Sequence, residues 1–279
     1  MLSPKLQRFA AGQLLFSCPI CQQDLQLVDS SLQCPQGHSY DLAKFGYVNL
    51  APQAKASQNY DKSSFEQRHL ILESGFYQHI LDEILIILKE NKDLHTLLDI
   101  GCGEGYYARH IQTKTSTDVY AFDLSKASIQ LASKQDKRQV VKWFVADLAH
   151  LPIQNQKIDG ILDIFSPANY QEFERVLSSH GLLIKVIPNH DHLQEIRQLV
   201  QEQLQKKDYS NQKVLEHFEE HFELIEKINT RQTLALNEEE REALLAMTPL
   251  LFHIKTDQID WTQLNNITIS ATILVGKKK

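Results

Sequence analysis

Apolar residues recur at helical spacing over residues 76–88, "FYQHILDEILIIL", and predict an amphipathic helix of about three turns. Beyond this helix, short apolar runs alternate with further helical patterns. The runs typical of strands are residues 95–102, 118–125, 141–148, 157–167 and 180–188. The patterns typical of helices are residues 107–114, 126–135, 169–179 and 190–204.

Strands that alternate with helices of this length form βαβ units, so the pattern predicts a mainly parallel sheet covered on both faces. Two later apolar runs, residues 222–236 and 267–277, predict strands on either side of a helix at residues 237–247. Asn237 and Glu240 give this helix a capping-box start, with asparagine in place of the usual serine or threonine. The predicted fold class is α/β.

The first part of the chain lacks this alternation. Residues 51–64, "APQAKASQNYDKSS", are polar and rich in small residues, without apolar periodicity, which is typical of a linker. We therefore predict a small head domain with its linker over residues 1–60 and a larger body over residues 61–279.

The chain of 279 residues has a formal net charge of −6. No apolar run approaches the roughly 18 to 20 residues of a membrane helix, and the start lacks the pattern of a signal peptide. We expect a cytoplasmic protein without a membrane partner. The negative charge argues weakly against nucleic acid as a partner, but the acid excess lies in the body. The mildly basic head is compatible with RNA.

Three of the four cysteines lie within the first 34 residues, unlike a secreted disulfide framework. Cys18 and Cys21 form a C-x-x-C pair, and Cys34 and His38 form a C-x-x-x-H pair after twelve intervening residues. Three thiolates and one imidazole are a recognised tetrahedral set for zinc and leave no open position for catalysis. We predict one structural zinc ion. The alternatives are chance clustering and a redox C-x-x-C, which would need a thioredoxin-like setting.

The segment "LLDIGCGEGYY" follows a predicted strand and precedes a helix, the place where open α/β sheets bind ligands. Gly101, Gly103 and Gly105 do not form a dinucleotide fingerprint. Tyr106 stands where the last glycine of that fingerprint is required. Asp99 at the strand end suits a cationic or zwitterionic ligand instead.

Two further acids end the next strands. Asp123 in "YAFDLS" can accept hydrogen bonds from both hydroxyls of a ribose, and Asp147 in "FVADLAHLP" lies within reach of an adenine edge. Together with Asp99 they describe an adenosine site without phosphates, which S-adenosylmethionine fits. These motifs resemble the class I S-adenosylmethionine-dependent methyltransferases. The resemblance implies a Rossmann-like methyltransferase domain, and the cysteine and histidine pairs predict a small N-terminal zinc ribbon beside it.

Further motifs extend the resemblance over nearly the whole chain. They are "CPICQQDL", "CPQGHSYDLAKFGYVNL", "ESGFYQHI", "IFSPANYQEFERVL", "IPNHDHLQEIRQL" and "LLAMTPLLFHIK". This series resembles the bacterial RlmA family, which methylates N1 of a guanine in a hairpin loop of 23S ribosomal RNA. The resemblance implies zinc at the four head ligands and S-adenosylmethionine contacts by Tyr77, Gly103, Glu104 and His192. Without it, Tyr77 would be interpreted as a packing aromatic and His192 as part of a solvated loop.

A guanine loses its N1 proton before or during methylation, and a general base would assist. Asp163, in the segment after the fourth strand, is the candidate, with a structural strand-end acid as the alternative. The head would hold RNA through basic and aromatic residues, although aromatics after a metal knuckle also serve as packing. These residues are Arg8, Lys44, Phe45, Tyr47 and Lys55.

Two other functions are left open by the sequence. A small-molecule methyltransferase would share the fold but would not need a zinc head. A non-catalytic RNA-binding protein with a degenerate cofactor fold would not need the intact glycine loop and Asp123. The sequence does not determine which guanine is chosen or the oligomeric state, so a homodimer is left open.

Overall fold

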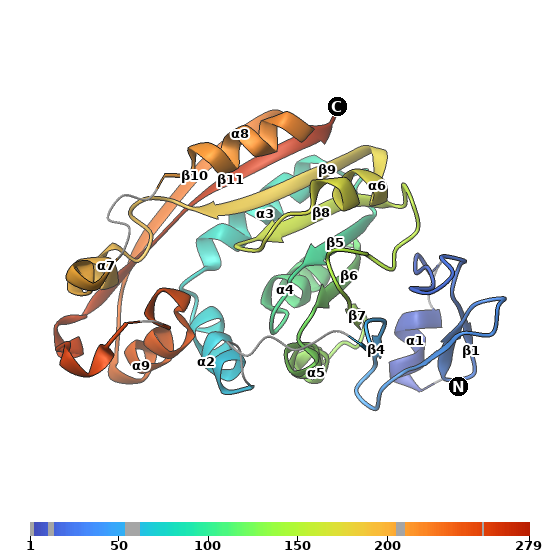
Figure 1. Cartoon of the computed structure of the whole chain (residues 1–279), viewed down its shortest axis with the longest axis horizontal. Coiled ribbons are helices and arrows are strands. Elements are labelled where there is room, and N and C mark those ends of the chain that lie inside the picture. Colours follow the sequence, from blue (N-terminus) through green and yellow to red (C-terminus); the bar gives the residue numbers. More distant parts are fainter. Residues whose placement is uncertain (1–2, 11–13, 54–61, 205–209, 253) are drawn as a thin grey trace.

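The computed structural model describes residues 3–10, 14–53, 62–204, 210–252 and 254–279. Within these ranges, the centre of the molecule is an eight-stranded sheet of order β10-β11-β9-β8-β5-β6-β7-β4 (Figure 1). Strands β4 to β9 run parallel, and β11 lies antiparallel between β9 and β10. The strands are β4 (Tyr47–Asn49), β5 (Thr96–Ile100), β6 (Asp118–Asp123), β7 (Lys142–Val145), β8 (Ile158–Ile164), β9 (Leu177–Pro188), β10 (Phe222–Ala235) and β11 (Asn266–Lys278).

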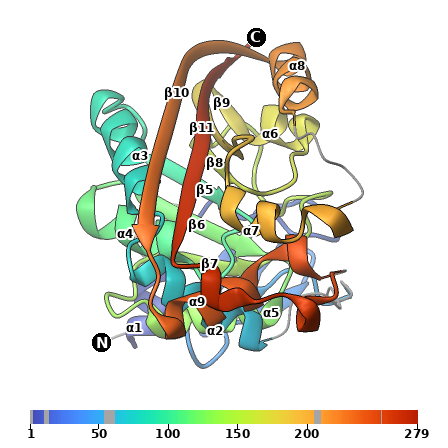
Figure 2. The ribbon, with the colours of Figure 1, turned by 90° about the vertical axis from the view of Figure 1, so that its left-hand side faces the viewer.

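Helices cover both faces of the sheet because successive strand residues point to opposite sides. In β5, Leu97 belongs to the core that holds α3, α4 and α5, and Leu98 belongs to the opposite core with α6 and α8. Figure 2 shows α3 and α4 on one side of the sheet and α6 and α8 on the other. These helices are α3 (Gln78–Glu90), α4 (Tyr106–Lys114), α5 (Lys126–Gln135), α6 (Tyr170–Val176) and α8 (Gln212–His221).

Three more helices lie toward the carboxyl ends of the parallel strands (Figure 1). Helix α2 (Lys62–Glu73) packs against α9 (Glu238–Met247), and α7 (Gln194–Leu199) packs against β11. Short 3-10 turns complete this region at Gln201–Gln203, Pro249–Leu251, Thr256–Gln258 and Trp261–Gln263.

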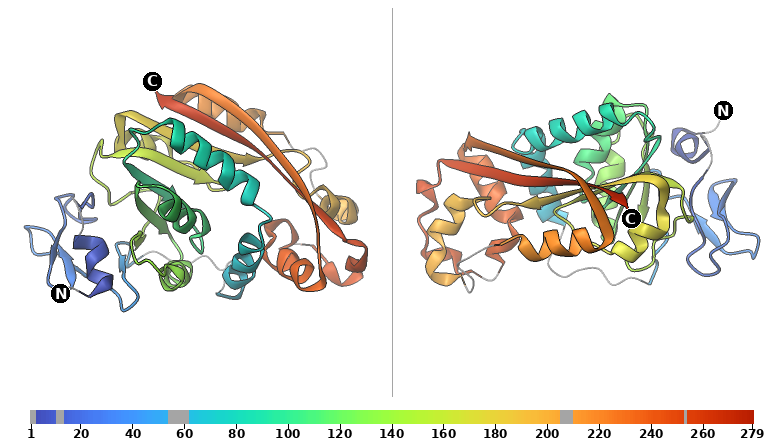
Figure 3. Two further views of the ribbon diagram at one scale, coloured as in Figure 1. Left: turned by 180° about the vertical axis from the view of Figure 1, so that it is seen from behind. Right: turned by 90° about the horizontal axis from the view of Figure 1, so that it is seen from above.

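The head consists of helix α1 (Pro4–Ala10) and a small antiparallel sheet of β1 (Gln26–Val28), β2 (Ser31–Gln33) and β3 (Ser39–Asp41). It lies at the opposite end of the molecule from α7 and α9 (Figure 3). Its core continues into the body, because Phe16 is fully buried against Tyr120 and Phe144, with ring centroids 5.3 and 5.1 Å away. The head therefore shares the hydrophobic core of the sheet.

The head is also joined to the body by strand β4, which lies beside β7 in the main sheet although it precedes residue 60. Residues 54–61, which include most of the expected linker, lie outside the described residues. The domain boundary near residue 60 stays a prediction.

The predicted alternation of strands and helices is confirmed from β5 to β11. Helix α9 has the predicted capping box: Glu240 N donates to Asn237 Oδ1 at 2.9 Å, and Asn237 N donates to Glu240 Oε2 at 3.0 Å. The helix expected over residues 169–179 ends at Val176, because Leu177 already pairs with Ile158 in the sheet.

Other helices differ more from the prediction. The helix expected over residues 190–204 is reduced to α7 and the 3-10 turn after it. Helices α1, α2 and α8 were not predicted from the sequence. Helix α2, "KSSFEQRHLILE", has a weak apolar stripe, so its formation depends on packing against α9.

Candidate cofactor site and metal centre

The four predicted zinc ligands converge in the head, with their ligand atoms all within 4.8 Å of one another. His38 Nδ1 lies 3.3 Å from Cys34 Sγ and 3.5 Å from Cys18 Sγ, and Cys21 Sγ lies 3.6 Å from Cys34 Sγ. Three sulfurs and one imidazole nitrogen at this spacing fit a tetrahedral zinc ion. The Tyr40 hydroxyl lies 3.4 Å from Cys18 Sγ, where it can donate to a thiolate and orient it. The cluster is a structural zinc site.

The glycine loop joins β5 to α4 at the carboxyl edge of the sheet. Gly103 N donates to Asp123 Oδ2 at 3.0 Å, so the loop contacts the predicted ribose acid directly. Ser125 N donates to Asp123 Oδ1 at 2.7 Å. Gly105 precedes α4 with a φ of +83°, and a Cβ at this position would collide with the Trp143 ring. Both conditions require glycine, and they explain Gly105 by the close approach of the backbone before α4 to the Trp143 side chain of β7.

A cavity of about 320 Å³ opens beside the loop, at the carboxyl ends of β5 to β8. The predicted cofactor residues that line it are Gly101, Gly103, Asp123 and Asp147. Other elements close its remaining sides. They contribute Phe65 and Arg68 of α2, Phe165, Ser166 and Pro167 after β8, and Met247 of α9. The cavity therefore lies where the sequence predicted the adenosine site.

Asp99 lies at the base of the loop and is not among the residues that line this cavity. The residue is 2% exposed, and its Oδ2 has no hydrogen-bond partner among the described residues. Burial raises the pKa of Asp99 to about 8, although the Ala108 backbone N–H offsets part of that rise. The negative charge of Asp123 adds to it. A buried acid with one unpartnered oxygen fits a site for a ligand that carries positive charge.

Tyr77 and His192, which the family resemblance implied, meet in one buried aromatic cluster. Their ring centroids lie 6.3 Å apart. The Phe165 ring packs beside both, with its centroid 6.0 Å from that of Tyr77 and 5.4 Å from that of His192. Ser270 N donates to His192 Nδ1 at 3.3 Å, which leaves Nε2 as the donor of the neutral ring. Burial lowers the pKa of His192 to about 4, so the ring is neutral at pH 7. Phe165 alone of the three lines the cavity, so it joins the cluster to it.

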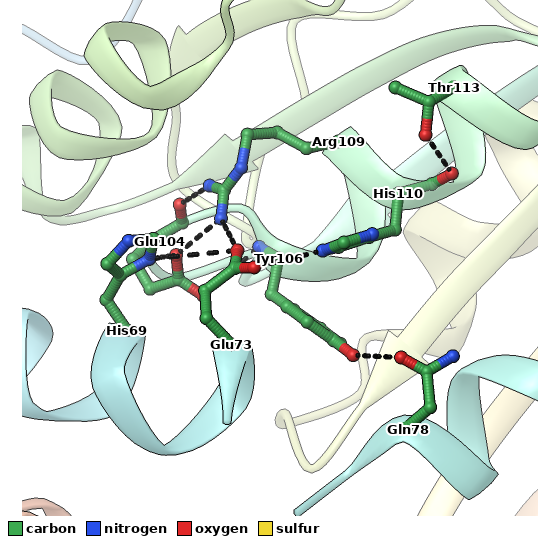
Figure 4. A network of polar contacts seen from close by, with 8 residues as sticks. All are labelled: His69, Glu73, Gln78, Glu104, Tyr106, Arg109, His110 and Thr113. Atoms are coloured by element: carbon green, nitrogen blue, oxygen red, sulfur yellow. Dashed lines mark hydrogen bonds and ion pairs between the residues drawn. The ribbon is translucent and has the colours of Figure 1, made fainter. Parts of the chain in front are cut away.

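Glu104 is held in a network that connects the glycine loop with α2 and α4 (Figure 4). Its Oε2 lies 2.9 Å from His69 Nδ1 and accepts from Arg109 Nη2 at 3.0 Å. Arg109 Nη2 also donates to Glu73 Oε1 at 2.8 Å. Burial acts to raise the pKa of Glu104, but the His69 hydrogen bond and the Arg109 charge outweigh it, so the pKa is lowered. The carboxylate is thus engaged by protein groups and orders the loop.

Asp163 lies near the end of β8, fully buried, and its Oδ2 accepts from Lys185 Nζ at 2.5 Å. Burial raises the pKa of Asp163 to about 6, and the charge of Lys185 offsets part of that rise. Asp163 is not among the residues that line the cavity, and its contacts are those of a buried ion pair. Its role as a general base stays a prediction.

The basic and aromatic residues expected to contact RNA have different environments. Arg8 is buried, and its Nη1 donates to Gly46 O at 3.0 Å and Val141 O at 3.1 Å. Tyr47 is buried in β4. For both residues the prediction is wrong, because their side chains pack the head against the body.

The other residues expected to contact RNA begin with Phe45, which is partly exposed. The Nζ atoms of Lys44 and Lys134 lie 5.8 and 4.6 Å from the centroid of its ring. Lys55 lies outside the described residues.

Comparison with known proteins agrees with this geometry. Residues 16–58 match the family "RlmA, N-terminal", and residues 97–185 match the family "Methyltransferase domain". The Bacillus subtilis protein YxjB, whose name places it among 23S rRNA (guanine-N(1)-)-methyltransferases, is 36% identical over 282 residues. That match covers 95% of this chain and 97% of YxjB. This chain belongs to the RlmA family.

A second relative is the 23S rRNA (guanine(748)-N(1))-methyltransferase of Streptomyces fradiae. It is 28% identical over 270 residues, which cover 92% of this chain and 95% of the relative. Membership of the RlmA family confirms the predicted methyltransferase fold with its zinc ribbon, with S-adenosylmethionine as methyl donor and one structural zinc ion. No helix in the described ranges has the length and hydropathy needed to cross a membrane.

Three residues of this RlmA chain were missed by the sequence analysis. Phe165 precedes the Ser-Pro turn after β8, and its position at a strand end was the available signal. Arg68 falls on α2, a helix that the apolar pattern did not predict. Lys134 of α5 reaches Phe45 of the head only through the tertiary fold. No local pattern pointed to Arg68 or Lys134.

Proposed function

We propose that this chain transfers a methyl group from S-adenosylmethionine to N1 of a guanine in a hairpin loop of 23S ribosomal RNA. The observation that carries the proposal is the cavity between the glycine loop and the Ser166–Pro167 turn, in a chain with an RlmA zinc ribbon. Relatives named for this reaction, which align over most of the chain, support it.

The cofactor supplies an electrophilic methyl group, and the protein supplies alignment and exclusion of water. We expect Asp123 to accept hydrogen bonds from the ribose hydroxyls and Asp147 to lie at the adenine edge, because both line the cavity. Tyr77 and His192 would meet the methionine part beside Phe165. Since His192 is neutral, it offers a hydrogen-bond donor at Nε2 without adding charge beside a sulfonium.

The guanine is expected on the side of the cavity formed by Ser166 and Pro167, which follow β8. Loop nucleotides are already partly unstacked, so moving the target base into such a site costs less than in a duplex. Asp163 is the candidate base. Its pKa of about 6 leaves it ionised at neutral pH. To accept the guanine proton, its carboxylate would have to give up the hydrogen bond from Lys185 Nζ.

Phe45, Lys44 and Lys134 form the surface that we propose for RNA contact. Two ammonium groups around one aromatic ring offer partners for phosphates and for an unpaired base. Phe16 and β4 attach the head to the sheet, so this surface has a fixed position relative to the cavity. We infer a cytoplasmic location from the ribosomal RNA substrate, and a homodimer stays open.

The direct test is methyl transfer from labelled S-adenosylmethionine to 23S ribosomal RNA that lacks the modification, followed by mass mapping. We expect N1-methylguanosine at one hairpin-loop position. Transfer to compounds of a metabolite extract, and not to RNA, would favour a small-molecule methyltransferase. Absence of S-adenosylmethionine binding in calorimetry would favour a non-catalytic RNA-binding protein.

The RNA surface has its own test within the same assay. Lys134→Glu should raise the KM for RNA by about tenfold, because each lost phosphate contact weakens binding, and should leave cofactor affinity unchanged. Lys89→Glu, an equal charge change at an exposed position of α3, is the control. An unaltered KM in Lys134→Glu would remove this surface from the proposal.

A further inference from the structure

Arg68 is the one cationic side chain among the described residues that line the cavity, alongside the acids Asp123 and Asp147. S-Adenosylmethionine carries a carboxylate at the end of its methionine part. A carboxylate that enters a partly closed cavity requires donors or a positive charge, because it loses hydration there. Arg68 is placed to supply both.

The Arg68 guanidinium lies over the glycine loop. Its Nε is 3.5 Å from the point that a Cβ of Gly103 would occupy, so the absence of a side chain there leaves room beside it. Burial raises the pKa of Tyr77, Asp99 and Asp123, and the charge of Arg68 acts against that rise at all three. Arg68 is therefore near the part of the site where Asp99 and Tyr77 lie.

Arg68 is half-buried, yet its side chain forms no hydrogen bond or ion pair with the residues that the structure describes. Its neighbours on α2 are engaged: His69 contacts Glu104, and Glu73 pairs with Arg109 (Figure 4). These contacts hold α2 against the glycine loop. Within the described part of the chain, the guanidinium thus has no hydrogen-bond or ion-pair partner at the wall of the cavity.

We propose that Arg68 binds the methionine carboxylate of S-adenosylmethionine. The inference rests on the proposed function, because it adds a residue to the same cofactor site. A guanidinium can donate two parallel hydrogen bonds to one carboxylate, an arrangement that a lysine ammonium does not reproduce. Arg68 thereby distinguishes the complete cofactor from adenosine derivatives that lack the amino-acid part.

The test is calorimetric titration of the zinc-loaded protein with two ligands. S-Adenosylhomocysteine has the carboxylate, and 5′-methylthioadenosine lacks the whole amino-acid part. In Arg68→Met we expect the affinity for S-adenosylhomocysteine to fall about 10- to 100-fold, with the affinity for 5′-methylthioadenosine unchanged. Arg68→Lys should lose less. Arg138→Met, at an exposed position in the turn before β7, is the control and should bind both ligands normally.

Equal losses for both ligands in Arg68→Met would assign Arg68 to the shape of the cavity and overturn the inference. No loss for either ligand would overturn it as well. A loss confined to binding of a 23S hairpin oligonucleotide would assign Arg68 to an RNA phosphate, again against the inference. If the unaltered protein did not bind S-adenosylhomocysteine, the proposed function would fail instead, so the two failures are distinguishable.

Discussion

Asp99 has a pKa raised to about 8 by burial, and one of its oxygens lacks a partner among the described residues. An acid with a raised pKa binds its proton more tightly in the folded than in the unfolded state. The free energy of unfolding therefore falls as pH rises from the ordinary aspartate pKa of 3.8 to about 8, because the folded state resists ionisation of Asp99. A cation bound in the adjoining cavity favours the ionised carboxylate and acts in the opposite direction.

We predict that S-adenosylmethionine binding releases protons between about pH 6 and 8, because the cationic ligand lowers the pKa of Asp99. The apparent affinity should rise with pH over the same interval. Calorimetry in buffers of different ionisation enthalpy measures the proton release directly. In Asp99→Asn the release should disappear, and an equal release in that variant would contradict the assignment.

For Asp163 we predict that Asp163→Asn lowers the free energy of unfolding by about 3 kcal/mol, because Lys185 is left buried without a counter-charge. Urea denaturation measures the loss, and the double variant Asp163→Asn, Lys185→Met should recover most of it. Activity of the double variant then tests the base. Near-normal kcat would exclude Asp163 as the base, whereas a kcat reduced at least 100-fold would support it.

Helix α2 forms part of the wall of the cavity because some of its side chains anchor it to the glycine loop and α4 while others reach the cavity. His69 and Glu73 join it to Glu104 and Arg109, and Phe65 and Arg68 line the cavity. Glu104 sits at the centre of this arrangement, fully buried. The glycine loop and α2 should therefore lose order together when Glu104 is changed.

We predict that Glu104→Gln lowers the free energy of unfolding by about 2 kcal/mol, since Arg109 loses one of its two carboxylate partners and keeps only Glu73. Affinity for S-adenosylhomocysteine should fall in parallel, because the loop is less ordered. Glu90→Gln, at the exposed end of α3, is the matched control. If the free energy of unfolding and the affinity for S-adenosylhomocysteine both equalled those of the control, the network around Glu104 would not order the glycine loop.

The head and body share one core across the whole molecule. Phe16 packs between Tyr120 and Phe144, and Arg8 bonds to the backbone on both sides of the junction, at Gly46 and Val141. Zinc orders the head, while this core and β4 attach it to the sheet. Removal of the head would therefore expose apolar surface of the methyltransferase domain.

Phe16→Ala should lower the free energy of unfolding by about 3 to 5 kcal/mol, as expected for a buried aromatic removed from a packed core. Urea denaturation followed by tryptophan fluorescence checks it, because Trp143 lies in β7 beside β4. Phe45→Ala, at a partly exposed ring of the head, should cost much less. A loss below about 1 kcal/mol in Phe16→Ala would mean that the head does not contribute to the stability of the body.

The sequence was most informative where spacing itself defines the chemistry. The cysteines and histidine of the head needed only their C-x-x-C and C-x-x-x-H spacing, and the site converges as expected. Asp123 and Asp147 were found because Asp123 ends β6 and Asp147 closely follows β7, and parallel strands of a sheet end at one edge. Family resemblance, rather than local chemistry, pointed to Tyr77 and His192.

The sequence alone determined the alternation of strands and helices from β5 to β9, the zinc ligands and the acids at the carboxyl edge, because these depend on periodicity and short spacings. Tertiary structure decided which of those residues face the cavity. It buried Arg8 in the junction, paired Asp163 with Lys185, and placed Arg68 over the glycine loop. These outcomes depend on contacts between residues far apart in the chain, and the local sequence carries no signal for them.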